Sequence, residues 1–537
     1  MVRVAARRRR EAVIPPAWAG VTSSSVDGFV THRARWDVGG ATTWVLEWRK
    51  RLTSVFSCVL SRTDAVYETL TMYERSFAAI SERFFKREAW PAPRAISSLA
   101  DDDKVFVLLY AELYYRHLYM TMTPSVDERK ASWENYCALF GVALHGDVNM
   151  QLPNLWLYEM VDEFVYQFQS FHQYKVSPKR TAEEKSALDA LDKQVWDQTS
   201  VVNFLQALVD KSDVKRVLER ERAGEISFAK DEGYSIESSN VLRTLGYFAL
   251  IGISRVHVLV GNYEGALASL DAIDLDKEGM FTKVSGAFVA TSYHVGFAYL
   301  MCSRYTDAIR HFNESLQYID RVKNGSTRPH ALPLLMKKQE QMYALLAIIS
   351  ALVPGQQHLL DDGVALNLHQ KYSDKISRMM NGEVSIYDEL FSYACPKFVG
   401  SQEAYKTQLK AFLEIVAAHA VIPKLRSHLK MYATVKVAKL AAVMDVSESD
   451  LRASLTAFDK ANTVKQWNGG ASALDGDDVY CGDIRVTMEG DVIKVAEMKN
   501  RKSAKTFFEQ TNKKLSMQLE ELKAAKPLVV KPSAIVS

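Results

Sequence analysis

Helical periodicity runs from about residue 50 to residue 425, and no other feature restricts the fold of this chain as much. Glycine is sparse there, prolines cluster between the periodic runs, and no alternating strand pattern persists. Residues 63–85, 103–120, 152–174 and 201–212 each space their apolar side chains at helical intervals. The sequence therefore predicts an all-α architecture over most of its length.

The segment 152–174 raises the question of whether such a helix is catalytic or structural. At about 100° per residue, one side gathers five apolar residues: Leu157, Val161, Phe164, Phe168 and Phe171. Glu159, Asp162 and Glu163 project from the opposite side among polar residues. Acid–base chemistry needs an apolar pocket that raises a carboxyl pKa, so we interpret the carboxylates as a polar face and the aromatic residues as packing.

A duplication indicates helical repeats. Aligning Tyr263 with Tyr305 brings Ala266 onto Ala308, at an offset of 42 residues. The aligned positions also pair Leu267 with Ile309, and Leu270 with Phe312. A tyrosine followed by a small residue at this spacing is typical of tetratricopeptide-like helix pairs, which must stack on neighbours to bury their apolar faces. The sequence therefore predicts a helical-repeat (TPR-like) solenoid.

The pattern changes near residue 430. Residues 432–461 predict a short extended lead, a helix over 437–444, a turn capped by Ser447 and a second helix through Phe458. A glycine- and aspartate-rich loop follows, and residues 483–497 then predict a β-hairpin around a Glu489–Gly490 turn. Two helices followed by a two-stranded wing predict a winged helix.

A further amphipathic helix is predicted over residues 504–525. Its apolar stripe contains Ala504 and four larger side chains that we expect to form a partner interface: Phe508, Leu515, Leu519 and Leu522.

Composition narrows the classes of function. The 537 residues are 48% hydrophobic and carry a net charge of +3, which gives no overall electrostatic case for nucleic-acid or membrane binding. Five scattered cysteines argue for a reducing compartment and against a zinc site. No apolar run approaches the roughly 18 residues that span a bilayer. The first fifty residues, with five arginines among the first ten, are expected to form a flexible basic arm, although a mitochondrial transit peptide stays open.

No catalytic, cofactor-binding or metal-binding residues are predicted. The sequence has no phosphate-binding loop, dinucleotide turn, nucleophile elbow or HExxH helix. Asp475 and Asp477 lack the other ligands of a calcium loop. His117, His294 and His311 lie in helical patterns and are interpreted as packed or surface residues. Cys137, beside Tyr136 on an apolar helix, is interpreted as buried and not nucleophilic.

DNA reading by the winged helix is disfavoured. Its second helix offers Glu448, Asp450, Arg452 and Asp459, and phosphates repel the acidic members. The first helix is flanked by Lys430, Lys436 and Lys439, which permit weak contact with the phosphate backbone of a nucleic acid.

A solenoid that ends in a winged helix and a terminal helix resembles the PCI domain of proteasome-lid, signalosome and initiation-factor scaffold subunits. Several segments resemble more closely the subunit l family of eukaryotic translation initiation factor three. These segments are YAELYYRHLYM (110–120), SWENYCALF (132–140), LPNLWLYEMVDEFVYQFQSFHQYK (152–175), LGYFALIGISRVHVLVGNYEGAL (245–267) and TSYHVGFAYLMCSRYTDAIR (291–310). Two more, AYKTQLKAFLEIV and LRSHLKMYATVKVAKLAAVMD, lie nearer the carboxyl end. The resemblance covers roughly residues 65–500.

This resemblance implies a non-catalytic, cytoplasmic scaffold subunit that docks subunits k and e and reaches the small ribosomal subunit within the complex. The expected domains are a basic arm (1–50), an N-terminal helical region (51–245), TPR-like repeats with the helical part of the PCI domain (246–425), its winged helix (426–497), and a C-terminal helix with its tail (498–537). Two alternatives stay open: a PCI subunit of the proteasome lid or signalosome, and a winged-helix nucleic-acid-binding factor.

Overall fold

The computed structural model describes most of the chain between residues 77 and 523. Its described ranges are 81–82, 85–97, 102–145, 151–226, 239–325, 332–470 and 472–498, with Phe77, Phe228 and ten residues between 508 and 523. The predicted basic arm (1–50) and most of the helix predicted at 63–85 lie outside them. The chain divides into two compact units, one of residues 1–256 with 272–284 and one of residues 257–271 with 285–537.

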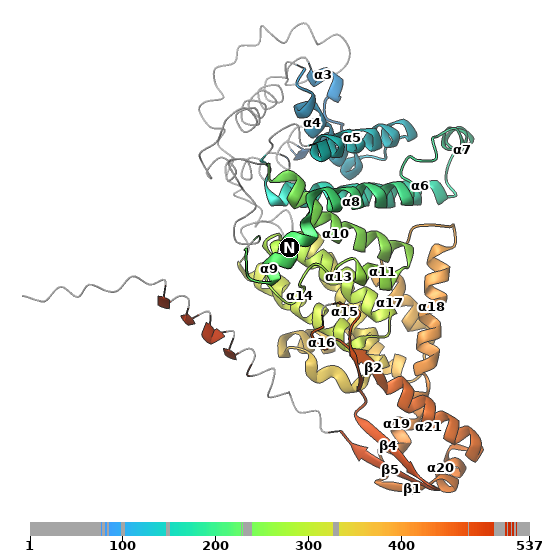
Figure 1. Ribbon diagram of the computed structural model, residues 1–537. Helices are drawn as coiled ribbons and strands as arrows, with labels where there is room; N and C mark the ends of the chain where they lie inside the picture. The colour runs from blue at the N-terminus through green and yellow to red at the C-terminus, as the bar shows by residue number, and fades with distance from the viewer. Residues whose placement is uncertain are drawn as a thin grey trace, which may run out of the picture. The chain divides into compact units, whose positions relative to one another are not determined.

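All described secondary-structure elements of the first unit are helices (Figure 1). Its elements are α3 (Pro93–Ser97), α4 (Lys104–Thr121), α5 (Val126–His145), α6 (Asn154–Val176), α7 (Ala182–Asp189), α8 (Gln198–Ser212), α9 (Val214–Arg222), most of α10 (Val241–Val260) and α12 (Met280–Lys283). The helices predicted at 103–120, 152–174 and 201–212 correspond to α4, α6 and α8. Asp103 caps α4 by accepting hydrogen bonds from the backbone N–H groups of Val105 and Phe106.

Aromatic packing holds the first unit together around Phe164 of α6. Its ring lies 5.1–6.0 Å, centroid to centroid, from four other rings, those of Trp133, Tyr136, Phe140 and Trp196. All five apolar residues on the predicted buried side of α6 are at most 4% exposed. The structure therefore confirms that the aromatic residues of this helix form a core, which burial of such large side chains stabilises.

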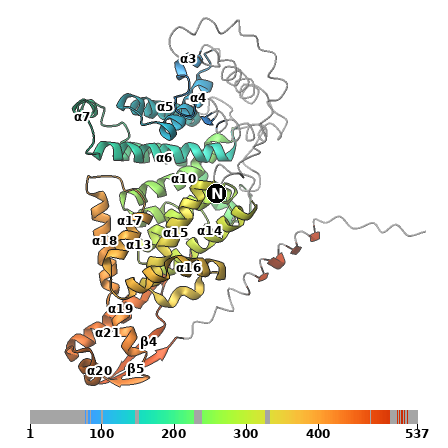
Figure 2. The same ribbon diagram turned by 180° about the vertical axis from the view of Figure 1, so that it is seen from behind.

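The second unit contains the repeats, further helices and all described strands. Its helices are α11 (Tyr263–Ala268), α13 (Ser285–Met301), α14 (Tyr305–Gly325), α15 (Leu332–Leu352), η4 (Pro354–Leu359), α16 (Asp362–Met380), α17 (Val384–Ala394), α18 (Ala404–His419), α19 (Val421–Leu429), α20 (Val437–Met444) and α21 (Glu448–Asn462). Its strands are β1 (Thr434–Lys436), β2 (Thr463–Gln466), β3 (Asp477–Tyr480), β4 (Ile484–Glu489) and β5 (Val492–Glu497). In both views α13, α14 and α15 lie side by side (Figures 1 and 2).

The predicted duplication is present in the structure. Ala266 and Ala308 are both fully buried, so the helices that carry them approach their neighbours closely. The turn before each repeat helix is closed by equivalent hydrogen bonds: the N–H of Asn262 donates to the carbonyl of His257, and the N–H of Arg304 donates to the carbonyl of Tyr299. The equivalent turns of the two repeats are therefore 42 residues apart, as predicted, and they share the same backbone hydrogen bond.

The winged helix forms as predicted, with two adjustments. The hydroxyl of Ser447 accepts the N–H of Asp450 at 3.1 Å, which caps α21. That helix continues to Asn462, beyond the predicted end at Phe458. Strands β4 and β5 form the predicted hairpin, but Glu489 pairs with Val492, so the two turn residues are Gly490 and Asp491. The extended lead becomes β1, which pairs with β5 and makes a sheet of order β1-β5-β4.

The segment predicted as a glycine- and aspartate-rich loop contains more structure than expected. Strands β2 and β3 pair in antiparallel register from Thr463 opposite Tyr480 to Gln466 opposite Asp477. The chain between Gln466 and Asp477 joins the two strands. We refer to the described residues 467–470 and 472–481, which include β3, as the wing loop. Lys465 and Asp478 interrupt the apolar pattern in these short strands, which is why periodicity missed them.

One described helix corrects the expectation that no stretch is apolar enough to span a bilayer. By length and composition, α10 could cross a membrane. However, 78% of its apolar window is buried inside the structure, and the core helix of a soluble protein meets the same criterion.

Candidate interaction surfaces

The second helix of the winged helix has an acidic surface. Glu448, Asp450 and Asp459 are exposed along α21. The guanidinium of Arg452 is turned toward the wing, where it donates to Asp491 Oδ1 at 2.5 Å and to the carbonyl of Gly490 at 3.3 Å. The one arginine of this helix therefore contacts the neighbouring hairpin, and the helix presents little positive charge to a phosphate backbone.

The basic residues around the first helix are partly engaged within the domain. Lys430 lies 2.9 Å from a carboxylate oxygen of Asp483, and Arg426 binds the same carboxylate at 2.7 Å. The ammonium of Lys439 lies 5.5 Å from the centre of the Tyr432 ring, within range of a cation–π contact. All three lysines that flank the first helix are exposed. Among the described residues, Lys430 pairs with an acidic side chain, whereas Lys436 and Lys439 do not.

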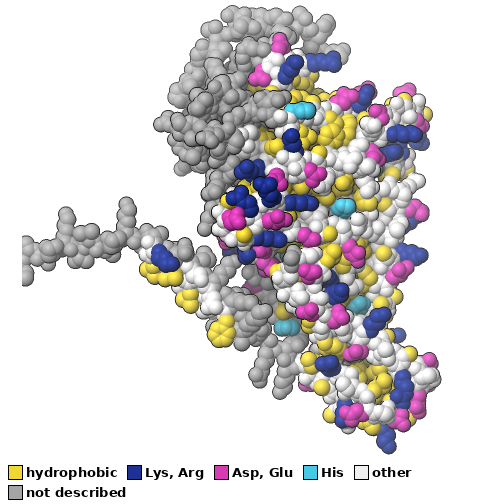
Figure 3. Space-filling model, in the orientation of Figure 1, with side chains coloured by type: hydrophobic (Ala, Val, Ile, Leu, Met, Phe, Trp, Pro, Cys, Tyr) yellow, Lys and Arg dark blue, Asp and Glu magenta, His cyan; other side chains and the backbone are white. Residues whose placement is uncertain are grey.

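Exposed apolar side chains lie on the winged helix. Met431, Val443, Val446 and Met488 are 41–63% exposed, although the same domain buries a full core of its own. Figure 3 shows hydrophobic and charged side chains mixed over the face of this region that it draws. Apolar side chains scattered singly among charged ones are normal on a protein surface, so they do not by themselves mark a binding site.

The four predicted interface residues near the C-terminus are all described and all exposed. Phe508, Leu515, Leu519 and Leu522 have exposed fractions of 62%, 56%, 53% and 72%. The described residues of this segment are helical, so the three leucines share one side, as the spacing predicts.

The carboxylates of α6 are less solvated than the sequence suggested. Asp162 forms an ion pair with Arg255 at 2.5 Å, and Glu159 forms one with Arg116 at 2.6 Å. Burial raises the pKa of Glu163 to about 7, and its Oε1 accepts a hydrogen bond from the side chain of Gln167 at 2.9 Å. The prediction of a solvated polar face is therefore wrong for Glu163, because α6 is packed on more than one side.

This perturbed carboxyl does not form a catalytic pair. Asp162, its neighbour in sequence, is held by Arg255 and by the hydroxyl of Tyr158 at 3.2 Å. The charged groups that act on Glu163 are Arg116, Glu112 and Asp162, and the first two belong to a buried structural cluster. Structural ion-pair networks also raise pKa values, and the groups around Glu163 are engaged in hydrogen bonds and ion pairs within the unit, so we interpret Glu163 as a structural residue.

The predicted histidines and cysteine occupy packed positions. His117, His294 and His311 are each at most 8% exposed. Burial lowers the pKa of His117, and it lowers that of His311 to about 3, which keeps both rings neutral. Burial raises the pKa of the Cys137 thiol to about 11, which disfavours the nucleophilic thiolate.

Within the described ranges, no three residues among His, Cys, Asp and Glu are placed to hold a metal ion. Asp475 and Asp477 instead accept hydrogen bonds from the backbone of Ser472 and the side chain of Asn468.

These features define the class of the chain. A mainly α-helical protein, with TPR-like repeats followed by a winged helix and a helical C-terminal segment, has the architecture of a PCI-domain protein. A family described as "RNA polymerase I-associated factor PAF67" matches residues 128–515.

Curated relatives give the particular family. The chain is 39% identical over 455 residues to eukaryotic translation initiation factor 3 subunit L of Homo sapiens, which covers 81% of this chain and 80% of the relative. It is 38% identical over the same length to that subunit of Danio rerio, covering 81% and 78%. The chain belongs to the eukaryotic translation initiation factor 3 subunit L family, and it is a subunit of a translation initiation factor.

Proposed function

We propose that this chain is a non-catalytic scaffold subunit, which docks other subunits of the initiation factor through its winged helix and its C-terminal helical segment. Within the complex it acts in the cytoplasm on the small ribosomal subunit. Its nearest partners are subunits k and e, and its contact with ribosomal RNA is secondary. In this proposal, residues 246–425 contain the TPR-like repeats and the helical part of the PCI domain, and residues 426–497 form its winged helix. Residues 498–537 form a docking helix with its tail.

The observation that carries this proposal is the exposed leucine stripe of Leu515, Leu519 and Leu522. Three exposed leucines on one side of a helix leave apolar surface in water, at a cost of about 25 cal/mol for each Å². A partner helix that covers them recovers this free energy, as in amphipathic helices that dock into apolar grooves. The acidic surface of α21 supports a protein partner over a nucleic acid for the winged helix.

The experiment is co-purification with a triple variant. Replacing Leu515, Leu519 and Leu522 with aspartate puts three charges into the docking side, which should reduce recovery of the other initiation-factor subunits at least tenfold. The far-ultraviolet circular dichroism should stay unchanged, because the stripe is not part of the folded core. Unchanged recovery of the other subunits would contradict the docking role.

A matched control carries the same added charge on the same segment. At 100° per residue, Thr506, Gln510 and Ser516 of the predicted helix fall about 90° or more from the centre of the leucine stripe, and replacing them with aspartate should leave co-purification intact. If both triple variants lose the partners equally, charge alone explains the loss and the stripe is not the docking surface.

A further inference from the structure

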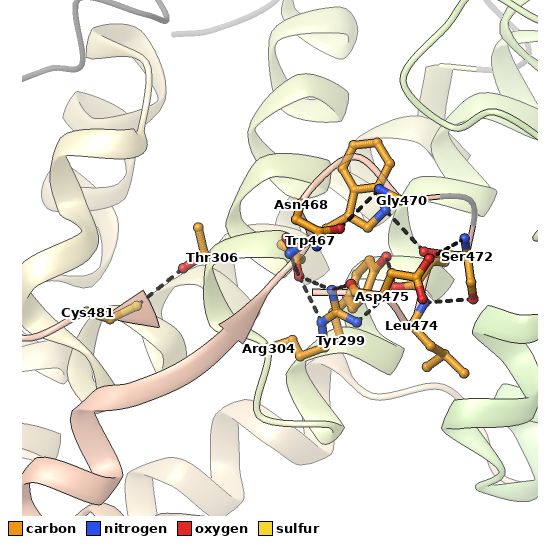
Figure 4. A network of polar contacts seen from close by, with 12 residues as sticks. Tyr299, Arg304, Thr306, Trp467, Asn468, Gly470, Ser472, Leu474, Asp475 and Cys481 are labelled. Atoms are coloured by element: carbon orange, nitrogen blue, oxygen red, sulfur yellow. Dashed lines mark hydrogen bonds and ion pairs between the residues drawn. The ribbon is translucent and has the colours of Figure 1, made fainter. Parts of the chain in front are cut away.

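The turn that begins the second repeat holds the wing loop through a buried ion pair. Arg304 and Asp307 are 4% and 2% exposed, and their side chains approach to 2.7 Å. Both groups come from the start of α14, whereas the wing loop follows more than 150 residues later in the chain. Figure 4 shows Arg304 directed at the wing loop from the repeat.

The ion pair binds the backbone of the loop. Arg304 donates from Nη1 to the carbonyl of Ala473 and from Nη2 to the carbonyl of Asp475, both at 2.9 Å. Asp307 accepts the N–H of Trp467 at 3.1 Å. Because these bonds involve ionised groups out of water, they are stronger than bonds between neutral partners.

Two other residues of the repeats bind the same loop. Asp271, at the end of the first repeat, accepts hydrogen bonds from the hydroxyl of Ser472 at 2.8 Å and from the N–H of Ala473 at 3.1 Å. The hydroxyl of Tyr299 donates to the carbonyl of Ala473 at 3.0 Å. The loop is therefore held by side chains from both repeats.

The end of the loop is fixed by a third set of contacts. The side chain of Gln356 donates to the carbonyl of Cys481 at 3.1 Å, and this carbonyl would lie only 2.6 Å from a Cβ atom at Gly355. Thr306 Oγ1 lies 3.5 Å from the Cys481 thiol. The absence of a side chain at Gly355 lets the two backbones approach this closely.

The first repeat shows what Arg304 adds. The equivalent residue there is Asn262, whose side chain caps α11 by accepting the N–H of Gly265 at 3.0 Å. The turn itself is closed in both repeats by the same backbone hydrogen bonds. An asparagine therefore suffices to build this turn, and the arginine is used to bind the wing loop.

We propose that the wing loop is a clasp, which fixes the orientation of the winged helix on the repeats. The chain joins the two regions through Ala420, the single residue between α18 and α19. The clasp adds a second attachment, made by side chains of the repeats on the wing loop. With both attachments in place, the winged helix is held in one orientation relative to the repeats. Without the clasp, it rotates about the chain connection at Ala420.

Hydrogen–deuterium exchange on the full chain tests the clasp, and it does not depend on any partner. The main variant, Arg304→Met with Asp307→Leu, removes both charges together so that neither is left buried and unpaired. A second variant, Asp271→Ala, removes one half-buried acceptor and keeps the ion pair. Both variants should raise the exchange rate of the amides of residues 467–475, by about tenfold in the first and less in the second.

The matched control is Asn262→Ala, which weakens the equivalent turn of the first repeat and should leave exchange in the wing loop unchanged. Orientation is measured by energy transfer between dyes at exposed positions 323 on α14 and 442 on α20. The distance distribution should broaden in the double variant and stay narrow in the control. Unchanged exchange in both clasp variants, or a distribution that stays narrow after the loop is released, would overturn the proposal.

Discussion

Gly261 and Ser303 occupy the same left-handed turn position in two successive repeats. Their φ angles are 90° and 58°, and their N–H groups donate to the carbonyls of Val258 and Leu300 at 3.2 and 3.0 Å. Only the glycine takes this conformation without strain from a side chain. The first repeat therefore builds this turn with a glycine, which tolerates a positive φ, and the second builds it with a serine, which is strained there.

Opposite effects on stability follow from exchanging the two residue types. Gly261→Ala adds a Cβ atom that collides with the side chain of Gln408 and forces alanine into a positive φ. We expect it to lower the free energy of unfolding by about 2 kcal/mol. Ser303→Gly removes strain and should change that free energy by no more than about 1 kcal/mol, toward greater stability. Thermal unfolding followed by circular dichroism measures both.

Gly261→Ala and Ser303→Gly control for each other, because the two positions share the same backbone geometry and differ only in what surrounds the Cβ atom. A destabilisation by Ser303→Gly as large as that by Gly261→Ala would show that the left-handed geometry is not the cause.

A second prediction concerns the pH dependence that Glu163 gives to the first unit. Its pKa is raised to about 7 in the folded protein, chiefly by burial, from an ordinary 4.5. The folded state therefore binds a proton more tightly than the unfolded state, and stability falls as pH rises from 4.5 through 7. Glu163→Gln keeps the uncharged shape and the contact with Gln167, so it should stabilise the protein at pH 8 and have little effect at pH 4.5.

The side chain keeps some contact with water, so we expect a gain of about 1–2 kcal/mol at pH 8. Chemical denaturation of the variant and the parent at the two pH values measures it. Glu183→Gln, an exposed change on α7, is the control and should alter neither curve. Equal effects of Glu163→Gln at pH 4.5 and 8 would refute the assignment.

The helices and the winged helix could be predicted because their signals are local. The apolar spacing of α6, the Ser447 cap and the repeat of Tyr263 at Tyr305 are each visible within a few turns of chain. The buried aromatic cluster around Phe164 follows from that spacing. The same kind of spacing predicts that Leu515, Leu519 and Leu522 share one side of a helix, and all three are exposed.

The environment of Glu163 and the clasp could not be predicted, because both depend on contacts between distant residues. Periodicity placed Glu163 on a polar side, but nothing in the sequence shows that a second layer covers that side. In the same way, Arg304 and Asp307 lie three residues apart like any surface pair on a helix. Their role is visible only once Ala473 and Asp475 are placed against them.

A third prediction tests the buried charge cluster of the first unit. Glu112 is fully buried and accepts hydrogen bonds from Arg116 at 3.2 Å and from the indole N–H of Trp156 at 3.1 Å. Glu112→Leu removes the buried carboxylate that pairs with the guanidinium of Arg116 and keeps the ion pair with Glu159, which is partly exposed. We expect a loss of about 3–5 kcal/mol in the free energy of unfolding.

The double variant Glu112→Leu with Arg116→Met should be less destabilised than Glu112→Leu alone, because no buried charge is left unpaired. Urea denaturation of the two single variants and the double variant completes the cycle. Additive losses across the cycle would mean that the two side chains do not act as a pair.

The last prediction concerns Asp483, which ties the wing to α19. Burial acts to raise the pKa of this carboxyl, but hydrogen bonds and charge from Arg426 and Lys430 outweigh it and hold the pKa below its ordinary 3.8. Stability from this group is therefore fully present above pH 3.8 and is lost as pH falls through the lowered value. Asp483→Asn should destabilise the winged helix at pH 7, by about 1–2 kcal/mol for a partly exposed bidentate contact, and by less at pH 2.

Hydrogen exchange of the β4 and β5 amides at the two pH values measures this effect on the winged helix alone. Asp491→Asn is the matched control, because Asp491 also pairs with an arginine but its side chain is 84% exposed. Water screens that pair, so the control should cost well under 1 kcal/mol at either pH. An equal loss from both substitutions at pH 7 would mean that burial of the Asp483 contact contributes nothing, because charge pairing alone would then explain both.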